Sequence, residues 1–232
     1  MYHNIQIKPD AIFIADAHYN HNRQELFELL SHTRASQIFL MGDIFDFLCS
    51  EVDYFIEQNY ELITLIKHLS TSREIIYLEG NHDFLLKDIF DKVVVVSRVS
   101  QPLIATLDDK KIALAHGDIF TPMSYDIFTK IIRNRYFLKF LNMIDFNNII
   151  SISVNEWLKQ KIICHDMNDF EQFAKNRIKL YKKYNVDTII EGHFHQGKNY
   201  KNYFNIPSYS CSKQLYAKLD YKSTQTYLKY CK

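Results

Sequence analysis

Long hydrophobic runs are missing from this 232-residue chain. No stretch reaches the roughly 18 apolar residues of a membrane-spanning helix, and residues 1–10 lack the apolar core of a signal peptide. Charge of one sign is not in excess either, because 28 Lys and Arg oppose 27 Asp and Glu. We therefore expect a soluble intracellular protein whose overall charge does not favour a nucleic-acid partner.

Cysteine is scarce and scattered. The four cysteines form no C-x-x-C pair; they are Cys49, Cys164, Cys211 and Cys231. This spacing predicts reduced thiols in a cytosol, and no disulfide framework.

Glycine is also scarce, with five in the chain. Three of them precede a candidate metal ligand and a fourth follows one; the four are Gly42, Gly80, Gly192 and Gly117. Glycine is used where the backbone bends unusually or approaches another group closely. Ordinary turn glycines after strands would explain the turns, but they would not explain these polar neighbours.

The first third of the chain alternates between strand and helix patterns. Short apolar runs predict buried strands at 11–15, 37–41 and 74–78, with helical spacing at 24–30 and 53–69 between them. This order predicts βαβ units around a largely parallel sheet, and thus an α/β fold. Polar motifs follow all three strands, where open α/β sheets place their ligands.

The remainder divides into strands and one long helical stretch. Shorter strands are predicted at 93–96, 103–107, 111–115 and 187–190, with further strands in the tail at 209–227. Asp108 and Asp109 are expected to turn a hairpin, and Asp166 or Asn168 to cap the last helix of the helical stretch. Because strand-end motifs lie on both sides of it, we predict a single domain, 1–232, with a helical insertion or cap at 120–185.

Five short motifs carry candidate metal ligands. In chain order they are D-x-H at 16–18, G-D-x-x-D at 42–46, G-N-H-D at 80–83, H-G-D at 116–118 and G-H-x-H at 192–195. In extended chain the first and third residues of D-x-H or H-x-H point to the same side. Mixed nitrogen and oxygen donors without thiolate suit Mn²⁺, Fe or Zn²⁺ better than Ca²⁺. Each motif alone is weak evidence, whereas the ordered set is specific.

This ordered set resembles the calcineurin-like metallophosphoesterases over residues 16–195. The resemblance implies a pair of packed sheets flanked by helices, with two divalent metal ions, Mn²⁺ before Fe or Zn²⁺, at the strand ends. It implies one metal held by Asp16, His18, Asp43 and His195, and a second held by Asp43, Asn81, His116 and His193. Two such metals lower the pKa of a bridging water and neutralise the phosphoryl oxygens during an in-line attack.

The same resemblance assigns roles beside the metals. His82 is expected to contact the phosphate or protonate the departing oxygen, and Asp83 to orient His82 or another site imidazole. Asn81 and Arg133 join His82 as expected substrate-binding residues. For Asp46 we prefer a role in which it contacts a metal-ligating side chain and not the metal itself. The alternative is a simple carboxylate at the end of a strand.

Within the superfamily the chain is most similar to the UDP-2,3-diacylglucosamine hydrolases of lipid A biosynthesis. The similarity rests on chain length, on residues 42–47 and 81–84, and on 116–118 followed by Tyr125, Phe128 and Arg133. It implies cleavage of a diphosphate to UMP and 2,3-diacylglucosamine 1-phosphate (lipid X), with acyl chains received by the insertion.

Two positions depart from that pattern. His82 stands where Arg is usual, and Gln196-Gly197 where Arg-Pro is expected. Arg clamps phosphate but cannot donate a proton, so His82 brings esters with poorer leaving groups into range. A phosphodiesterase or phosphatase acting on a soluble nucleotide or other phosphoester is therefore the alternative. A non-catalytic scaffold on the same fold is a further alternative, against which the complete ligand set argues.

The insertion admits two interpretations. Its apolar residues are too many for one narrow stripe, and basic residues alternate with them; these are Ile127, Phe128, Ile131, Ile132, Phe137, Leu138, Phe140 and Leu141, with Lys130, Arg133, Arg135 and Lys139. Such a segment suits acyl chains and anionic head groups, which predicts a nucleotide-lipid substrate and a cytoplasmic protein peripheral on the inner face of the membrane. A helical cap that buries its own core, with a solvated basic face, explains it equally well. The sequence leaves the oligomeric state open.

Overall fold

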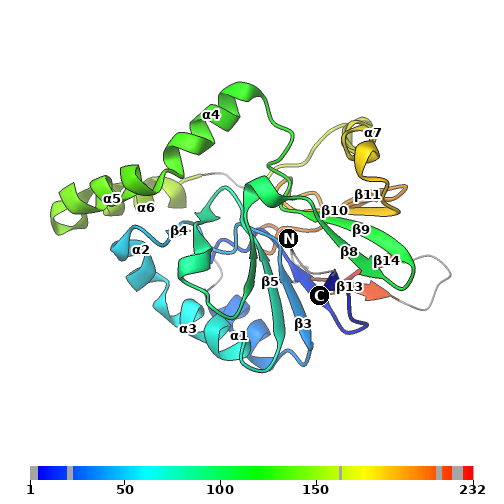
Figure 1. Ribbon diagram of the computed structural model, residues 1–232, viewed down its shortest axis with the longest axis horizontal. Helices are drawn as coiled ribbons and strands as arrows, with labels where there is room; N and C mark the ends of the chain where they lie inside the picture. The colour runs from blue at the N-terminus through cyan, green and yellow to red at the C-terminus, as the bar shows by residue number, and fades with distance from the viewer. Residues whose placement is uncertain (1–4, 20–22, 162–163, 213–215, 221–226, 232) are drawn as a thin grey trace.

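The computed structural model describes residues 5–19, 23–161, 164–212, 216–220 and 227–231. Two six-stranded sheets form its centre (Figure 1). The first sheet has the order β14-β13-β2-β3-β5-β7 and the second β1-β8-β9-β10-β12-β11.

The first sheet is built on four parallel strands, as the alternating pattern predicts. These are β2 (Ile12–Ile14), β3 (Gln37–Leu40), β5 (Glu74–Leu78) and β7 (Val94–Val96). Two tail strands extend it in antiparallel fashion, β13 (Tyr216–Asp220) on β2 and β14 (Tyr227–Cys231) on β13. Parallel strands buried on both faces explain the continuous apolar runs of the sequence.

The second sheet is mixed. It contains β1 (Ile5–Gln6), β8 (Leu103–Leu107), β9 (Lys110–Ala115), β10 (Thr188–Glu191), β11 (Lys198–Tyr200) and β12 (Tyr203–Asn205). Strands β8 and β9 form the expected hairpin around Asp108 and Asp109, while β9, β10 and β12 run parallel. The two sheets bury one shared core, to which Phe13, Phe39 and Leu78 contribute from the first and Leu114 and Phe204 from the second. The expected two-sheet sandwich is therefore confirmed.

Helices cover the outer faces of this sandwich. Helices α1 (Arg23–His32) and α3 (Tyr60–Leu69) pack on the first sheet, and α7 (Phe170–Tyr181) packs on the second (Figure 1). The helix expected at 53–69 is two helices, because α2 (Asp53–Gln58) ends at Asn59. The Asn59 side chain donates hydrogen bonds to the carbonyls of Phe55, at 2.7 Å, and Phe47, at 3.1 Å, and so competes with continued helix.

Three helices of the expected insertion project away from the sheets. Helices α4 (Met123–Ile132), α5 (Arg135–Ile144) and α6 (Ile149–Lys159) form this arm, whereas α7 lies on the second sheet (Figure 1). The cap expected from Asp166 or Asn168 comes instead from Asp169, whose side chain accepts a hydrogen bond from the Gln172 amide. No helix in the described part of the chain combines the length and apolar character needed to cross a bilayer.

Short elements complete the fold. They are β4 (Leu48–Cys49), paired with β6 (Asp83–Phe84), and the 3₁₀ turns η1 (Leu86–Asp88), η2 (Arg98–Ser100), η3 (Phe146–Asn148) and η4 (Lys182–Tyr184). Two or three residues are too few to show a hydrophobic period, so the sequence did not indicate them.

The expectation of four reduced thiols is wrong for two of them. Cys164, in the segment after the arm, and Cys211, in the loop after β12, form a disulfide. Their Cα atoms lie 5.3 Å apart, within the span that a disulfide bridges. Forty-seven positions separate them in sequence, so only folding brings them together. Cys49 is a buried free thiol, and burial raises its pKa to about 12.

Candidate metal centre

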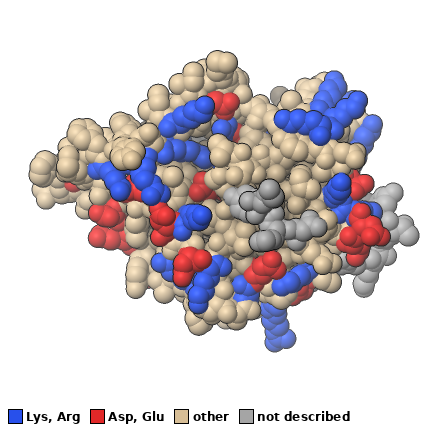
Figure 2. All heavy atoms as spheres, viewed as in Figure 1, with Lys and Arg blue, Asp and Glu red and all other residues tan. Residues whose placement is uncertain are grey.

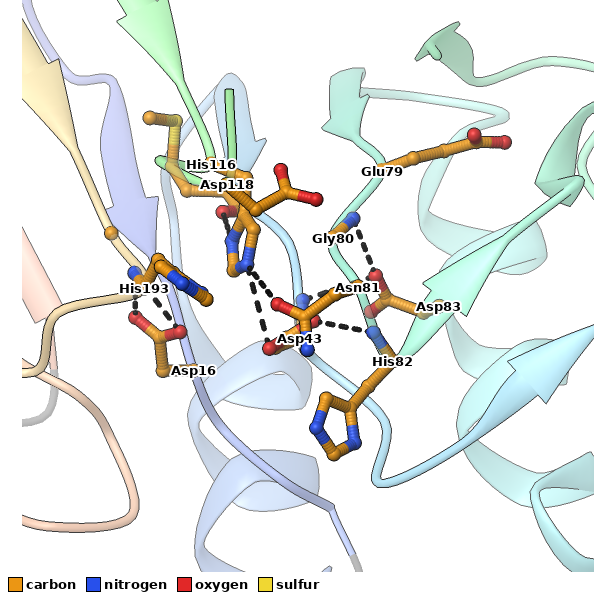
Figure 3. A network of polar contacts seen from close by, with 12 residues as sticks. Asp16, Asp43, Glu79, Gly80, Asn81, His82, Asp83, His116, Asp118 and His193 are labelled. Carbon is orange, nitrogen blue, oxygen red and sulfur yellow. Dashed lines mark hydrogen bonds and ion pairs between the residues drawn. The ribbon is translucent and has the colours of Figure 1, made fainter. Parts of the chain in front are cut away.

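The five motifs meet where the strands of the two sheets end (Figure 3). Asp16, Asp43 and Asn81 follow β2, β3 and β5 of the first sheet, and His116 and His193 follow β9 and β10 of the second. Two groups of donor atoms result, each with its atoms within 4.8 Å of one another: Asp16, His18 and His195; Asp43, His116 and His193. Asn81 joins the second group, since its Oδ1 lies 3.2 Å from His116 Nε2.

The backbone at these motifs is unusual. Five of the candidate ligands have left-handed φ angles: Asp16 (51°), His18 (45°), Asp43 (52°), His193 (63°) and His195 (59°). Residues other than glycine rarely adopt this conformation, and such residues gather at functional sites. The chain is therefore not extended at D-x-H and H-x-H, contrary to the sequence prediction, but turns sharply after β2, β3 and β10.

Glycines allow the loops to approach one another. A Cβ atom on Gly42 would lie 2.6 Å from His116 Cγ, and one on Gly80 would lie 2.5 Å from the Asp43 amide nitrogen. Neither position has room for a side chain. This close approach explains why the few glycines of the chain stand beside candidate ligands.

The protonation state of His116 follows from its contacts. Its Nδ1 lies 2.9 Å from the Met41 carbonyl oxygen, which can only accept, so Nδ1 carries the proton. The lone pair of Nε2 then faces two oxygens, Asp43 Oδ2 at 3.4 Å and Asn81 Oδ1 at 3.2 Å. Three electron-rich atoms this close require a shared cation or a second proton. Burial lowers the pKa of His116, but the Asp43 carboxylate outweighs it and holds the pKa well above its usual range.

His193 and Asp43 are poised in forms that bind metal. Burial and the neighbouring His116 lower the pKa of His193 to about 4, so its imidazole is neutral near pH 7. Burial alone would raise the pKa of Asp43, yet the adjacent His116 and His82 hold it well below its usual range. Neutral imidazole and ionised carboxylate are the forms that ligate metals.

The first group contains a buried imidazole, His18, whose contacts leave it poorly satisfied. Neither ring nitrogen of His18 makes a hydrogen bond within the described part of the chain, although Nδ1 lies 3.3 Å from Asp46 Oδ1. His195 Nε2 lies 3.2 Å from Asp16 Oδ1, and the His193 amide donates to the same carboxylate at 2.8 Å to Oδ2. Buried polar groups are normally satisfied, so this donor set fits a cation, as the second group does.

Comparison with known proteins agrees with this geometry. The family model of the calcineurin-like phosphoesterases matches residues 11–197, which include all five motifs. The chain belongs to this phosphoesterase family. It is a metal-dependent hydrolase, and the two donor groups suit the dinuclear metal site that the family uses.

Several curated relatives of this phosphoesterase carry the description UDP-2,3-diacylglucosamine hydrolase. The protein of Histophilus somni is 24% identical over 204 residues, covering 82% of this chain and 86% of that protein. The Haemophilus influenzae (strain PittGG) protein is 25% identical, and the match covers 79% of this chain and 82% of that protein. The Blochmanniella pennsylvanica protein is 26% identical, and the match covers 83% of this chain and 81% of that protein. A solved structure, phosphopantetheinyl hydrolase from Mycobacterium tuberculosis, aligns over 87% of this chain and 89% of that chain, with 13% identity and a TM-score of 0.40.

His82 lies beside the ligands of this phosphoesterase. Its amide donates a 2.8 Å hydrogen bond to Asp43 Oδ1, and the centroid of its half-buried ring lies 5.1 Å from that of His18. The ring Nδ1 lies 2.6 Å from the carbonyl oxygen of Asp46, so Nδ1 carries a proton and Nε2 is the nitrogen left for other partners. Asp46 therefore contacts two site imidazoles, His82 through its carbonyl and His18 through its carboxylate.

Asp83 was expected to orient His82 or another site imidazole, but its hydrogen bonds go to other groups. Its fully buried carboxylate accepts hydrogen bonds from five donors: the amides of Gly80, Asp43, Ile44 and Phe45, and the hydroxyl of Tyr77. His82 Nδ1 contacts Asp46 and not Asp83. Asp83 thus joins the loop after β3 to the loop after β5, and acts on the ligands through their backbones.

Arg133 connects the arm to the site. Its guanidinium donates a 2.6 Å hydrogen bond to the Gly80 carbonyl, next to Asn81, and stacks over the Phe84 ring with its Cζ 5.1 Å from the centroid. Arg98 anchors the start of the arm, through hydrogen bonds of 2.9 Å to Asp118 and 2.8 Å to Asp126.

Several residues support the site through contacts that the sequence does not indicate. Gln101 accepts a 2.7 Å hydrogen bond from the His116 amide, and Ser208 donates one of 2.9 Å to the Asp16 carbonyl. Gln196, which stands where the resemblance led us to expect Arg, contacts the segment before α7: it accepts a hydrogen bond from the Met167 amide at 2.8 Å and donates one to the His165 carbonyl at 3.0 Å. Isolated Gln and Ser residues give no signal in sequence, because only their tertiary neighbours set them apart.

Proposed function

We propose that this phosphoesterase cleaves the diphosphate of UDP-2,3-diacylglucosamine, releasing UMP and 2,3-diacylglucosamine 1-phosphate. The observation that carries the proposal is the pairing of two convergent donor groups with an apolar arm attached beside them. The relatives described as UDP-2,3-diacylglucosamine hydrolases, which match about four fifths of the chain, support the substrate class.

The proposed ligands are the seven residues of the two groups. One metal would be held by Asp16, His18, Asp43 and His195, and the other by Asp43, Asn81, His116 and His193. Mn²⁺ is the preferred metal, with Fe or Zn²⁺ as alternatives. When bound, two such ions supply Lewis-acid polarisation of the phosphoryl group and a water of lowered pKa. The protein fixes the donor atoms: Met41 sets the tautomer of His116, and Asp83 sets the separation of Asp43 and Asn81.

His82 is the proposed contact to the phosphate. Because its Nδ1 proton is directed to the Asp46 carbonyl, a proton held at Nε2 is the one that it can offer to a phosphoryl or leaving oxygen. A UMP or sugar-phosphate leaving group needs little acid help, whereas an alkoxide needs much. His82 therefore suits diphosphate cleavage and also keeps ester hydrolysis within reach.

The arm is the proposed lipid contact. Its three helices expose many large apolar side chains, among them Phe128, Phe137, Phe140 and Trp157 at 41% to 58% exposure. Apolar clusters rimmed by charge mark interaction sites, and lysine and arginine lie beside the arm on the face that Figure 2 displays. We propose that this surface contacts acyl chains and the membrane that holds them.

An apolar cavity lies between the arm and the body. It has a volume of about 70 Å³ and its lining includes Phe47, Phe55, Leu138 and Val154. Ligand pockets for small molecules usually measure about 300–1,000 Å³. Two acyl chains therefore need the exposed face of the arm, or a movement of the arm that widens this cavity.

A second candidate is hydrolysis of a soluble nucleotide or other phosphoester. His82 favours it, because a histidine assists poorer leaving groups than a diphosphate requires. The deciding experiment incubates the Mn²⁺-reconstituted protein with UDP-2,3-diacylglucosamine and follows UMP and the lipid phosphate. We expect both products in equal amounts and slow cleavage of the unacylated UDP-sugar. Efficient cleavage of soluble phosphoesters without cleavage of the lipid would favour the second candidate.

A further inference from the structure

A buried ion pair lies behind the second donor group, outside the motifs. Arg177, on α7, is 7% exposed, and its Nε donates a 2.9 Å hydrogen bond to Glu191 Oε2, while its Nη2 pairs with Glu191 Oε1. Its remaining donors reach the carbonyl oxygens of Gly117 and Ile119, both at 3.2 Å. All three guanidinium nitrogens are therefore engaged, in a place where arginine is rarely found.

Glu191 has equally complete contacts. Fully buried at the end of β10, it also accepts hydrogen bonds from the hydroxyls of Tyr181, at 2.5 Å, and Tyr203, at 2.8 Å. Desolvation of a buried ion pair offsets most of its Coulomb energy, and apolar replacements are often as stable. Stability alone therefore does not account for this pair.

The Arg177–Glu191 ion pair lies close in the chain to two candidate ligands. Gly117 directly follows His116, and Glu191 precedes His193 by two residues. Strands β9 and β10 pair in register up to Ala115 and Glu191, and then the sheet ends. Beyond that point Arg177 joins the two loops, with Cζ 5.2 Å from the ring centroid of Phe194, between His193 and His195.

We propose that Arg177 and Glu191 are positioning residues that set the spacing of His116 and His193, and so the affinity of the second metal position. The inference rests on the dinuclear site of the proposed function. Helix α7, which packs on the second sheet (Figure 1), thereby fixes the geometry of a site to which it contributes no ligand. Residues that orient metal ligands typically change metal affinity about 10–100-fold when replaced.

The test replaces the ion pair without leaving a buried charge. Arg177→Met combined with Glu191→Gln removes both charges, keeps one acceptor oxygen for the two tyrosine hydroxyls and places an NH₂ group at the other position. A matched control on the same helix, Lys175→Met with Glu171→Gln, removes the exposed pair whose atoms lie 2.6 Å apart. Mn²⁺ titration by calorimetry, electron paramagnetic resonance at two equivalents and thermal unfolding are measured for each protein.

We expect the control and the parent to bind two Mn²⁺ and to show a spin-coupled spectrum. The Arg177→Met/Glu191→Gln protein should unfold near the parent temperature, bind one Mn²⁺ as before and bind the other about 10–100-fold more weakly. Its spectrum should be that of isolated Mn²⁺. Arg177→Lys keeps the charge but loses the two-pronged contact, so its affinity for the more weakly bound Mn²⁺ should lie between those of the parent and the double variant. This single variant provides the test if the double variant does not fold.

Unchanged affinity for both ions in a folded variant would overturn the inference and leave the dinuclear site intact. Equal weakening of both ions, in proportion to lost stability, would also overturn it, because that is the behaviour of a purely structural pair. A parent protein that binds fewer than two Mn²⁺ would instead overturn the dinuclear proposal, and this inference with it.

Discussion

The carboxylate of Asp83 accepts a hydrogen bond from the backbone amide of Asp43 at 3.0 Å, and from that of Gly80, beside Asn81, at 2.9 Å. Burial raises the pKa of Asp83, and the neighbouring Asp43 raises it further. The five donors around it nevertheless hold it as an acceptor. The loops that carry two candidate ligands, Asp43 and Asn81, are thus joined by one buried side chain that is not itself a candidate ligand.

Asp83→Asn should lower both stability and metal content. The substitution keeps the shape but turns an NH₂ group toward backbone donors, and unsatisfied buried groups cost about 1–3 kcal/mol each. Urea unfolding measures the loss, and elemental analysis measures the metal. Asp109→Asn, in the exposed turn between β8 and β9, is the control. A variant as stable and as metal-rich as the parent would show that Asp83 does not organise these loops.

Asp43→Ala should abolish turnover in a folded protein, because the proposed bridge serves both metals. The parent, reconstituted with Mn²⁺, should contain close to two ions per chain, and the variant should retain much less. Metal content and hydrolysis of a soluble diester are measured together, with exposed Asp91→Ala as control. A single catalytic group typically contributes about 10²–10⁴-fold to the rate. Activity of the variant within about tenfold of the parent would therefore reject the bridging role.

His82→Arg should separate two classes of substrate. Arginine still binds phosphate but donates no proton, so alkyl esters should lose about 10²–10⁴-fold in kcat, while diphosphates lose far less. Exposed His68→Arg, on α3, serves as control. Equal losses on both classes would mean that His82 positions phosphate and does not act as an acid.

Alanine at Phe128, Phe137 or Phe140 should weaken the lipid reaction selectively. Loss of one aromatic contact, at roughly 25 cal/mol per Å², should lower kcat/KM for the diacylated substrate about ten- to a hundredfold. Bis-p-nitrophenyl phosphate should be cleaved almost as before. Phe27→Ala, an exposed aromatic on α1, is the control. If no arm variant separates the two substrates, the arm is a structural cap.

The candidate site was predictable because its chemistry is local. Each motif directly follows a buried strand, such as 37–41 before Asp43, and parallel strands bring their carboxyl ends to one edge. The structure places all seven predicted ligands there, including His193 and His195 from a second sheet that the residue pattern alone did not indicate. Strands as short as β1 and β12 leave no measurable period.

Other features depended on contacts between distant segments. The Cys164–Cys211 disulfide joins residues 47 positions apart, and Arg177 meets Glu191 only once α7 lies on the second sheet. Asp83 was identified as important, yet its partners are backbone amides, which no residue type reveals. Local sequence encodes which atoms can bind a metal and where strands end; the spacing of those atoms depends on long-range packing of loops, for which a single sequence carries no local pattern.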